Sequence, residues 1–179
     1  MIFRDEYSAN ERARRIRLLL LDVDGVLTDG TIIYNDEGVE TKVFNVKDGL
    51  GIRLLKLGDI DVGIATGRTS DALIHRCRNL GITHIFQGLK DKTVILENVC
   101  RQAGVEEDEI AFAGDDLLDI AIMKRVGLAV AVADAHPAVV DASHVVCAAR
   151  GGRGAVREIA EYLLTVQGKW ADILKRFTG

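Results

Sequence analysis

Proline, cysteine and aromatic side chains are all scarce in this chain of 179 residues. A single proline argues against a proline-rich or collagen-like chain, and aromatic residues make up only 5%. The three cysteines, Cys77, Cys100 and Cys147, lie far apart and form no CxxC pair. This spacing argues against a disulfide framework and against a zinc site. We therefore expect the cysteines to be small buried apolar side chains.

A surplus of positive charge and long apolar runs are also lacking. The 23 lysine and arginine residues are outnumbered by 27 aspartate and glutamate residues, giving a net charge of -4. Without a basic surplus, neither nucleic acid nor a membrane surface is an expected partner. No apolar run approaches the roughly 20 residues that cross a bilayer. The charged start, MIFRDEYSANERARRIR, lacks the apolar centre of a secretory signal, which predicts a cytoplasmic protein.

Short apolar runs alternate with helical patterns along most of the chain. Each run has the length of a strand that is buried on both faces. Such alternation predicts right-handed crossovers and an α/β fold, a Rossmann-like doubly wound parallel sheet. The length and the absence of a linker predict a single domain over residues 1–179. The expected strands are 16–23, 62–65, 110–113 and 128–132, and the expected helices are 48–57, 70–80, 90–103 and 116–126.

Two segments depart from this alternation. Between about 30 and 45, the stretches 31–34 and 41–44 flank the turn sequence NDEG, which predicts a β-hairpin inserted after the first strand. Between about 150 and 179, the glycine-rich sequence GGRG leads into an amphipathic helix. No other insertion is long enough to form a domain of its own.

Two aspartates come directly after the most apolar run. Asp22 and Asp24 follow four leucines in LLLLDVDGVLTDG. In an extended chain, residues two apart point to the same side, so these carboxylates repel each other and burial adds to the cost. Mg²⁺, which prefers oxygen ligands, would remove the repulsion. A solvent-exposed pair at a turn is the alternative, but the apolar run places both residues at the sheet edge where ligands bind.

Three further sites follow apolar runs or begin helices. Thr66, in IATGR, ends a strand at the start of a loop. Its hydroxyl, together with the backbone N–H groups of the loop, could hold a phosphate. Lys92, in GLKDKT, offers an ammonium group, although the pattern alone does not separate it from Lys90. A second acidic cluster could favour a helix start or converge with the first pair on one metal ion. It consists of Asp115, Asp116 and Asp119, in AFAGDDLLDI.

Together these sites supply the groups for phosphoryl transfer through a carboxylate nucleophile. They combine paired carboxylates, a hydroxyl, an ammonium group and a second acidic cluster. The sequence contains no GxxxxGK[ST], HExxH or GxSxG motif. P-loop nucleotide hydrolysis, zinc proteolysis and serine hydrolysis are therefore poorly supported.

In order, the four sites resemble the four motifs of the haloacid dehalogenase superfamily of phosphatases. DVDGVLTDG is similar to the first motif, Thr66 to the second, Lys92 to the third and GDDLLD to the fourth. The succession of NVKDGLGIR, ATGR, HRC, GITHIFQG, VAVADAHP and GGRGAVRE resembles a capless branch of that superfamily. The resemblance covers about residues 15–168. It implies a haloacid dehalogenase-like fold and hydrolysis of the 8-phosphate of an eight-carbon 2-keto-3-deoxy sugar acid, for lipopolysaccharide biosynthesis.

The resemblance also implies a role for each motif residue. Asp22 would attack phosphorus and form an aspartyl-phosphate, and Asp24 would serve first as an acid and then as a base. Mg²⁺ would be held by the carboxylates of Asp22 and Asp115 and by the backbone carbonyl of Asp24. Thr66 and Lys92 would hold the phosphoryl oxygens.

Further expectations from the resemblance concern the surroundings of the site. Asp119 would orient the waters of the metal or Lys92. Four subunits would form a homotetramer with help from the hairpins, and the GGRG loop would be a mobile flap. Arginine suits both a carboxylate and a phosphate because its planar group pairs with two oxygens. The expected substrate contacts are Asp24, Asn45, Val46, Lys47, Asp48, Gly49, Arg53, Arg68, Arg76, Lys92 and Asp116.

Three other functions remain open from the sequence. A phosphatase acting on a nine-carbon sugar-acid 9-phosphate would use the same catalytic residues. A non-catalytic assembly module would have no reason to keep a costly cluster of acidic residues. A phosphate-accepting receiver domain also has clustered aspartates, a threonine and a lysine, but its acceptor normally follows a later strand than the first.

Overall fold

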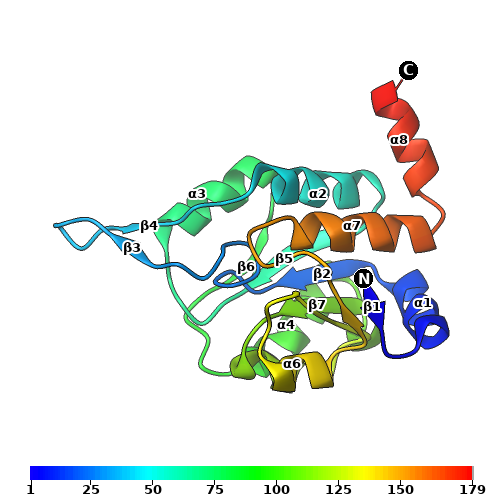
Figure 1. Cartoon of the computed structure of the whole chain (residues 1–179), viewed down its shortest axis with the longest axis horizontal. Helices are drawn as coiled ribbons and strands as arrows, with labels where there is room; N and C mark the ends of the chain where they lie inside the picture. The colour runs from blue at the N-terminus through cyan, green and yellow to red at the C-terminus, as the bar shows by residue number, and fades with distance from the viewer. Residues whose placement is uncertain (179) are drawn as a thin grey trace.

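The computed structural model describes residues 1–178, in which a mostly parallel sheet of seven strands lies between two layers of helices (Figure 1). The strand order is β1-β9-β8-β7-β2-β5-β6, and only the β1–β9 pair is antiparallel within this sheet. The doubly wound sheet predicted from the alternating pattern is therefore confirmed. The strands of the sheet are β1 (Ile2–Phe3), β2 (Leu18–Leu21), β5 (Asp61–Ala65), β6 (His84–Phe86), β7 (Ile110–Gly114), β8 (Leu128–Ala131) and β9 (Val145–Val146).

The central strand β2 explains why its leucine run is uninterrupted. Successive side chains of a strand point to opposite faces. Leu19 and Leu21 join one hydrophobic core, whereas Leu18 and Leu20 join the other. Both faces of the strand are covered, so no polar residue is tolerated until the strand ends at Asp22.

The helices form one layer on each face of the sheet. The first core is completed by α1, α2, α3 and α7, and the second by α4, α5 and α6. Two of these helices end at left-handed glycines, Gly81 and Gly104, a common way for a helix to end. The helices are α1 (Glu6–Arg15), α2 (Val46–Leu57), α3 (Asp71–Leu80), α4 (Leu96–Ala103), α5 (Ile120–Met123), α6 (Pro137–Ala142), α7 (Ala155–Val166) and α8 (Trp170–Thr178).

Some elements differ from the sequence expectation. The helices expected at 90–103 and 116–126 each begin with a tight 3-10 turn, Lys92–Ile95 and Leu117–Asp119, before the α-helical part. A third 3-10 turn is Glu107–Glu109. The short strands β1, β6 and β9 were not expected. Two or three residues carry too little periodicity to be recognised, and they become strands by pairing with a neighbour.

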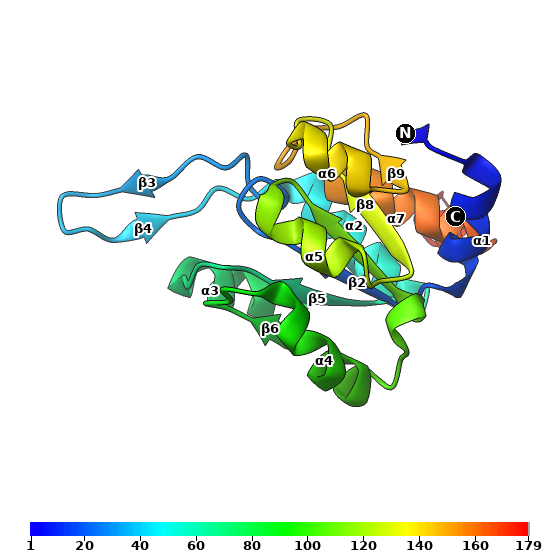
Figure 2. The same cartoon turned by 90° about the horizontal axis from the view of Figure 1, so that it is seen from below.

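The hairpin lies outside the sheet. It consists of β3 (Ile33–Tyr34) and β4 (Glu40–Thr41), joined through a turn in which the Gly38 N–H donates to Asn35 at 2.9 Å. The paired part is shorter than predicted, and the hairpin projects from the body of the molecule in both views (Figure 2). Within residues 1–178 the chain after β2 inserts this hairpin and no cap domain. No helix in this range is long and apolar enough to cross a membrane.

Candidate active site

The carboxyl ends of three adjacent strands bring the predicted motif residues together. In the parallel register of β5, β2 and β7, Leu21 lies opposite Ile64 and Ala113. The residues that follow these strands therefore meet at one edge, as is usual for ligand sites of open α/β sheets. A pocket of about 230 Å³ opens there. It is lined by Asp22, Asp24, Thr66, Gly67, Arg68, Lys92, Asp115, Asp116, Leu118 and Asp119.

Lys92 links the first acidic site to the second. Its Nζ lies 2.8 Å from Asp22 Oδ1 and donates a hydrogen bond to Asp119 Oδ1 at 2.5 Å. The lysine side chain is only 4% exposed, whereas Lys90 is exposed. The structure thus decides between the two lysines that the sequence pattern left open. Burial alone would lower the pKa of Lys92, but Asp22 and Asp119 together raise that pKa above its usual value.

Asp119 uses both of its carboxylate oxygens within the protein. Oδ1 accepts from Lys92, and Oδ2 accepts from the backbone N–H groups of Asp115 at 2.9 Å and Asp116 at 3.3 Å. The carboxylate is 1% exposed. It therefore fixes both the lysine and the start of the acidic loop. Gly114 is required beside it, because a Cβ at that position would lie 2.5 Å from Asp119 Oδ2.

The carboxylates of Asp22 and Asp115 sit in an unfavourable electrostatic environment. Burial is the main cause that raises the pKa of Asp22 to about 6, and Lys92 only partly offsets it. Burial likewise raises the pKa of Asp115 to about 8, with added repulsion from Asp22, Asp119 and Asp116. The folded state is destabilised when two buried carboxyl groups this close together are both ionised.

This donor set fits a divalent cation. Carboxylate oxygens of Asp22, Asp115 and Asp119 lie within 4.8 Å of one another. Asp115 Oδ1 is buried and has no hydrogen-bond partner among residues 1–178. The backbone turns close by at Gly25, whose φ is +91° and whose Cβ, if present, would lie 2.0 Å from Asp115 Oδ2. Hard oxygen donors without a partner and with excess negative charge suit Mg²⁺.

The raised pKa of Asp115 predicts how metal binding depends on pH. In the metal-free folded protein, Asp115 keeps a proton up to about pH 8, whereas the unfolded chain loses it near its usual value of 3.8. The stability contributed by this proton is complete below about pH 4 and is lost as the pH rises to about 8. We therefore expect the increase in melting temperature caused by Mg²⁺ to be larger at about pH 8.5 than at about pH 5.5.

Thermal melts with Mg²⁺ and with chelator at the two pH values check this expectation. Asp115→Asn should remove most of the magnesium effect at both pH values, because position 115 then has neither a charged ligand for the ion nor a proton to exchange. Asp141→Asn, at an exposed position, is the matched control. A magnesium effect that shrinks as the pH rises would contradict the assignment of Asp115.

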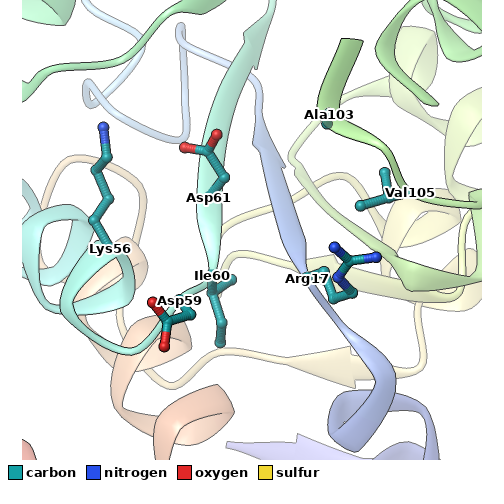
Figure 3. Close-up of a pocket in the computed structure, with 7 residues that line it drawn as sticks. All are labelled: Arg17, Lys56, Asp59, Ile60, Asp61, Ala103 and Val105. Carbon is teal, nitrogen blue, oxygen red and sulfur yellow. The ribbon is translucent and has the colours of Figure 1, made fainter. Parts of the chain in front are cut away.

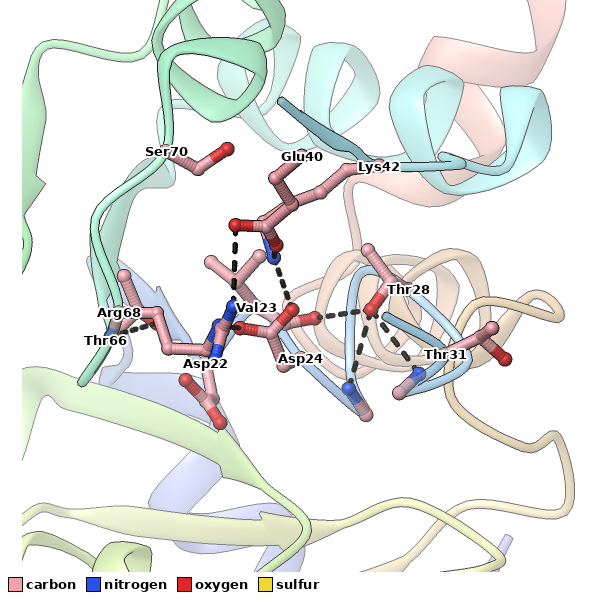
Figure 4. Close-up of polar contacts among 12 residues, drawn as sticks. Asp22, Val23, Asp24, Thr28, Thr31, Glu40, Lys42, Thr66, Arg68 and Ser70 are labelled. Atoms are coloured by element: carbon pink, nitrogen blue, oxygen red, sulfur yellow. Dashed lines mark hydrogen bonds and ion pairs between the residues drawn. The ribbon is translucent and has the colours of Figure 1, made fainter. Parts of the chain in front are cut away.

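Two hairpin residues that were not predicted as site residues, Glu40 and Lys42, contact side chains that line this pocket. Lys42 donates a hydrogen bond to Asp24 Oδ1, and its Nζ lies 2.7 Å from Glu40 Oε1 (Figure 4). Arg68 approaches Asp24 from another side, with Nε 3.7 Å from Oδ2. It also donates to Glu40 at 3.3 Å and to the Tyr34 hydroxyl at 3.0 Å. The sequence indicates that Glu40 and Lys42, two apart in an extended segment, share a face, but it does not show that this face meets Asp24.

The other expected substrate contacts lie away from this pocket. The Asn45 side chain caps α2 and donates to Gly152, and Arg76 donates to the Asn45 carbonyl. Asp48 is buried and accepts from the N–H groups of Gly154 and Arg157. Their contact with substrate stays a prediction. The remaining members of this group are Val46 and Lys47, which are exposed, Gly49, which packs against Arg76, and Arg53, which donates to Asn79.

The GGRG loop is fastened to the loop of the first motif. The Gly152 N–H donates to the Val26 carbonyl at 2.9 Å, and the approach is so close that a Cβ at Gly151 would lie 1.6 Å from the Gly25 oxygen. Arg153 pairs with Asp29 at 3.0 Å. Side chains larger than hydrogen would push these two loops apart. The opening of this loop as a flap stays a prediction.

Another pocket, of about 290 Å³, lies at the amino ends of the strands (Figure 3). Two of its charged groups have partners outside the pocket: Arg17 contacts Glu109 and the Gly104 carbonyl, and Asp61 contacts His84. Lys56 donates to the Gly81 carbonyl. Asp59 is exposed, and none of the residues that line this pocket has a buried polar atom without a partner among residues 1–178, in contrast to Asp24, Arg68 and Asp115 of the first pocket.

The fold and site together define a haloacid dehalogenase-like hydrolase. The family model with that description matches residues 81–159. Among curated relatives, 3-deoxy-D-manno-octulosonate 8-phosphate phosphatase of Escherichia coli (strain K12) is 48% identical over 158 residues, which are 88% of this chain and 84% of that protein. The phosphatase of Yersinia pestis is 48% identical over 89% of this chain and 85% of its own length. The chain belongs to the family of 3-deoxy-D-manno-octulosonate 8-phosphate phosphatases.

Solved structures of relatives agree with this placement. The Yersinia pestis phosphatase has a TM-score of 0.89 and 47% identity, covering 92% of this chain and 89% of its own. The phosphatase of Moraxella catarrhalis, solved with magnesium, phosphate and KDO, has a TM-score of 0.93 and 38% identity, covering 97% of this chain and 99% of its own. The resemblance to a capless branch of the superfamily is thereby confirmed.

Proposed function

We propose that this protein hydrolyses 3-deoxy-D-manno-octulosonate 8-phosphate to KDO and inorganic phosphate in a Mg²⁺-dependent reaction of lipopolysaccharide biosynthesis. The observation that carries the proposal is the buried cluster in which Lys92 joins Asp22 to Asp119 beside the unpartnered oxygen of Asp115. The Moraxella catarrhalis relative, whose structure contains magnesium, phosphate and KDO, supports both the metal and the substrate.

Asp22 is the proposed nucleophile. Its carboxylate attacks phosphorus, the bond from phosphorus to the sugar oxygen breaks, and an aspartyl-phosphate forms. Lys92, 2.8 Å away, keeps Asp22 ionised and oriented at a pH where burial would favour the protonated form. The same ammonium group and the Thr66 hydroxyl, which lines the pocket, bind phosphoryl oxygens.

Asp24 is the proposed acid and base. In the first step it gives a proton to the leaving sugar oxygen. In the second step it takes a proton from the water that attacks the phosphorus of the aspartyl-phosphate, which releases phosphate and restores Asp22. Asp24 suits this exchange because its side chain is 21% exposed and lines the pocket.

The carboxylates of Asp22 and Asp115 and the backbone carbonyl of Asp24 would hold Mg²⁺. When bound, the ion supplies positive charge that lets an anionic nucleophile approach an anionic phosphate. Asp119 acts through others: it orients Lys92 and the backbone of the acidic loop.

We propose that the protein forms a homotetramer in which the hairpins of neighbouring subunits contribute to the assembly. The hairpin exposes several apolar side chains, including Ile33, Tyr34, Val39 and Val43, which would be costly to leave in water. Packing these hairpins against neighbouring subunits would bury them and would help to close sites that lack a cap. Arg68 and Asp116 both line the pocket. Arg68 would pair with the carboxylate of the sugar acid, and Asp116 would accept a hydrogen bond from one of its hydroxyl groups. The cytoplasmic location stays a prediction.

Phosphate release from a small substrate panel tests the function. The panel contains the eight-carbon sugar-acid 8-phosphate, a nine-carbon sugar-acid 9-phosphate and common hexose phosphates, each with Mg²⁺ and with chelator. We expect Mg²⁺-dependent release with a strong preference for the eight-carbon substrate. Preference for the nine-carbon substrate would keep the mechanism and replace the pathway, and no release from any substrate would reject the proposal.

A further inference from the structure

The inward face of the hairpin strand β4 and its extension carries an ion pair. Side chains alternate along an extended chain, so Glu40 and Lys42 point to one side while Thr41 and Val43 point to the other. Thr41 and Val43 are exposed, whereas the Lys42 side chain is only 3% exposed. A lysine is rarely buried to this degree unless its charge is partnered. The hairpin therefore places a cation beside Asp24, which lines the active-site pocket, and exposes Thr41 and Val43 on its other side.

Lys42 contacts one oxygen of Asp24 and leaves the other free. Its Nζ donates to Asp24 Oδ1 and lies 2.7 Å from Glu40, so the ammonium group is fixed between two carboxylates. Asp24 Oδ2 is buried and has no hydrogen-bond partner within residues 1–178. Arg68 lies beside that oxygen, but at 3.7 Å its Nε is too distant for a hydrogen bond. The two oxygens of the same carboxylate thus have different environments (Figure 4).

We propose that Lys42, held by Glu40, is a positioning residue that orients Asp24 so that Oδ2 is the oxygen that carries the transferred proton. The inference rests on the proposed function, because it needs Asp24 to act as the acid and base. In the first step the proton on Oδ2 passes to the sugar oxygen as its bond to phosphorus breaks. In the second step Oδ2 takes a proton from the attacking water, and the bond from phosphorus to Asp22 breaks. Oδ1 stays on Lys42 throughout.

Orientation matters here because a carboxylate can rotate about its Cβ–Cγ bond. Proton transfer requires the donor oxygen within hydrogen-bond reach of the reacting oxygen, and small errors in placement have large effects on rate. One charge-assisted hydrogen bond to Oδ1 restricts this rotation. Glu40 restricts Lys42 in turn, and Arg68 would leave Oδ2 when it binds the sugar acid. Lys42 and Glu40 belong to the hairpin and Arg68 to the loop after β5, so none of these residues belongs to the turn after β2 that carries Asp24.

The test separates nucleophilic attack from proton transfer. An aryl phosphate such as p-nitrophenyl phosphate has a leaving group that needs no proton, so the formation of its aspartyl-phosphate does not depend on the acid. The hydrolysis of that intermediate still depends on the base. In a single turnover with excess enzyme, nitrophenolate release reports the first step and phosphate release reports the second.

In Lys42→Met we expect nitrophenolate release within about 3-fold of the unsubstituted protein and phosphate release slowed by about 10²-fold, as for the loss of general acid–base assistance. Turnover of the sugar-acid 8-phosphate should fall by a similar factor with little change in KM. Glu40→Gln should show the same division with a smaller loss, about 10-fold, and Lys42→Arg should recover part of the rate. Thr41→Val, on the opposite face of the strand, is the matched control.

Other outcomes would overturn the proposal. If both products are released at the normal rate in Lys42→Met, the lysine does not position Asp24. If both are slowed equally, or if only KM rises, the lysine supports the nucleophile, the fold or substrate binding instead. Should Lys42→Met fail to fold, Glu40→Gln decides between the same outcomes. If the unsubstituted protein releases phosphate from no substrate, the proposed function fails first and the role of Lys42 with it.

Discussion

Replacing Asp22 by asparagine is expected to lower Mg²⁺-dependent phosphate release by at least ~10⁴-fold while the protein stays folded. An amide has nearly the same shape as a carboxylate, but it is a poor nucleophile for phosphorus. Asp22 lies in a buried position where its carboxylate faces Lys92 and the crowded charges of Asp115 and Asp119. Loss of the charge therefore removes the reacting group and also reduces repulsion within the cluster.

Steady-state phosphate release measures the loss of turnover in Asp22→Asn, and a thermal melt measures whether the variant stays folded. Asp141→Asn makes the same chemical change at an exposed position and should keep normal turnover. Normal turnover in Asp22→Asn, with a folded protein, would reject Asp22 as the nucleophile. Loss of turnover together with loss of the folded state would leave the fold as the cause, and Asp22→Glu then tests whether a displaced carboxylate still reacts.

Replacing Lys92 by methionine is expected to lower the free energy of unfolding by about 3 kcal/mol and to reduce turnover by about 10²- to 10³-fold. Methionine keeps the apolar part of the side chain but not the ammonium group. Two carboxylates, those of Asp22 and Asp119, then remain buried without their shared cation. Removing one partner of a buried ion pair is costly because the other charge is left uncompensated.

The double variant Lys92→Met with Asp119→Asn distinguishes charge from packing. If the uncompensated carboxylate causes the instability, the double variant should be more stable than Lys92→Met alone, while turnover stays low because the phosphoryl oxygens still lack the ammonium group. Denaturant unfolding in the presence of chelator measures the stability without the contribution of bound Mg²⁺. Equal stability of the single and double variants would contradict the charge explanation.

The central part of the site could be predicted because its residues are tied to strong local patterns. Asp22 ends an apolar run that is buried on both faces, and Asp115 ends another, so their strands place both at one edge of the sheet. Residues that lie on short or irregular segments were harder to place. Lys90 and Lys92 are equivalent in pattern, and only packing against Asp22 and Asp119 separates them.

The part of the site that comes from the hairpin was missed for a related reason. Glu40 and Lys42 alternate with Thr41 and Val43 as in any exposed strand, and the pattern does not reveal which face meets another element. The tertiary structure turns the charged face toward Asp24, where the side chain of Lys42 becomes almost completely buried. In the same way, the GGRG sequence indicates a glycine-rich loop, but only the folded chain brings Gly151 against Gly25.

The sequence by itself determined the alternating α/β architecture, the edge at which the acids gather and the family, because these depend on local hydrophobic periodicity and on motifs that are contiguous in the chain. The tertiary structure alone decided which lysine meets the acids, how Asp119 divides its oxygens and which face of the hairpin reaches Asp24. The lysine contacts join residues 18 positions apart (Asp24 and Lys42), 27 apart (Lys92 and Asp119) and 70 apart (Asp22 and Lys92), and the contacts of Asp119 Oδ2 depend on the orientation of one loop. Such pairings are set by the free energy of packing the whole chain, and no short stretch of sequence encodes them.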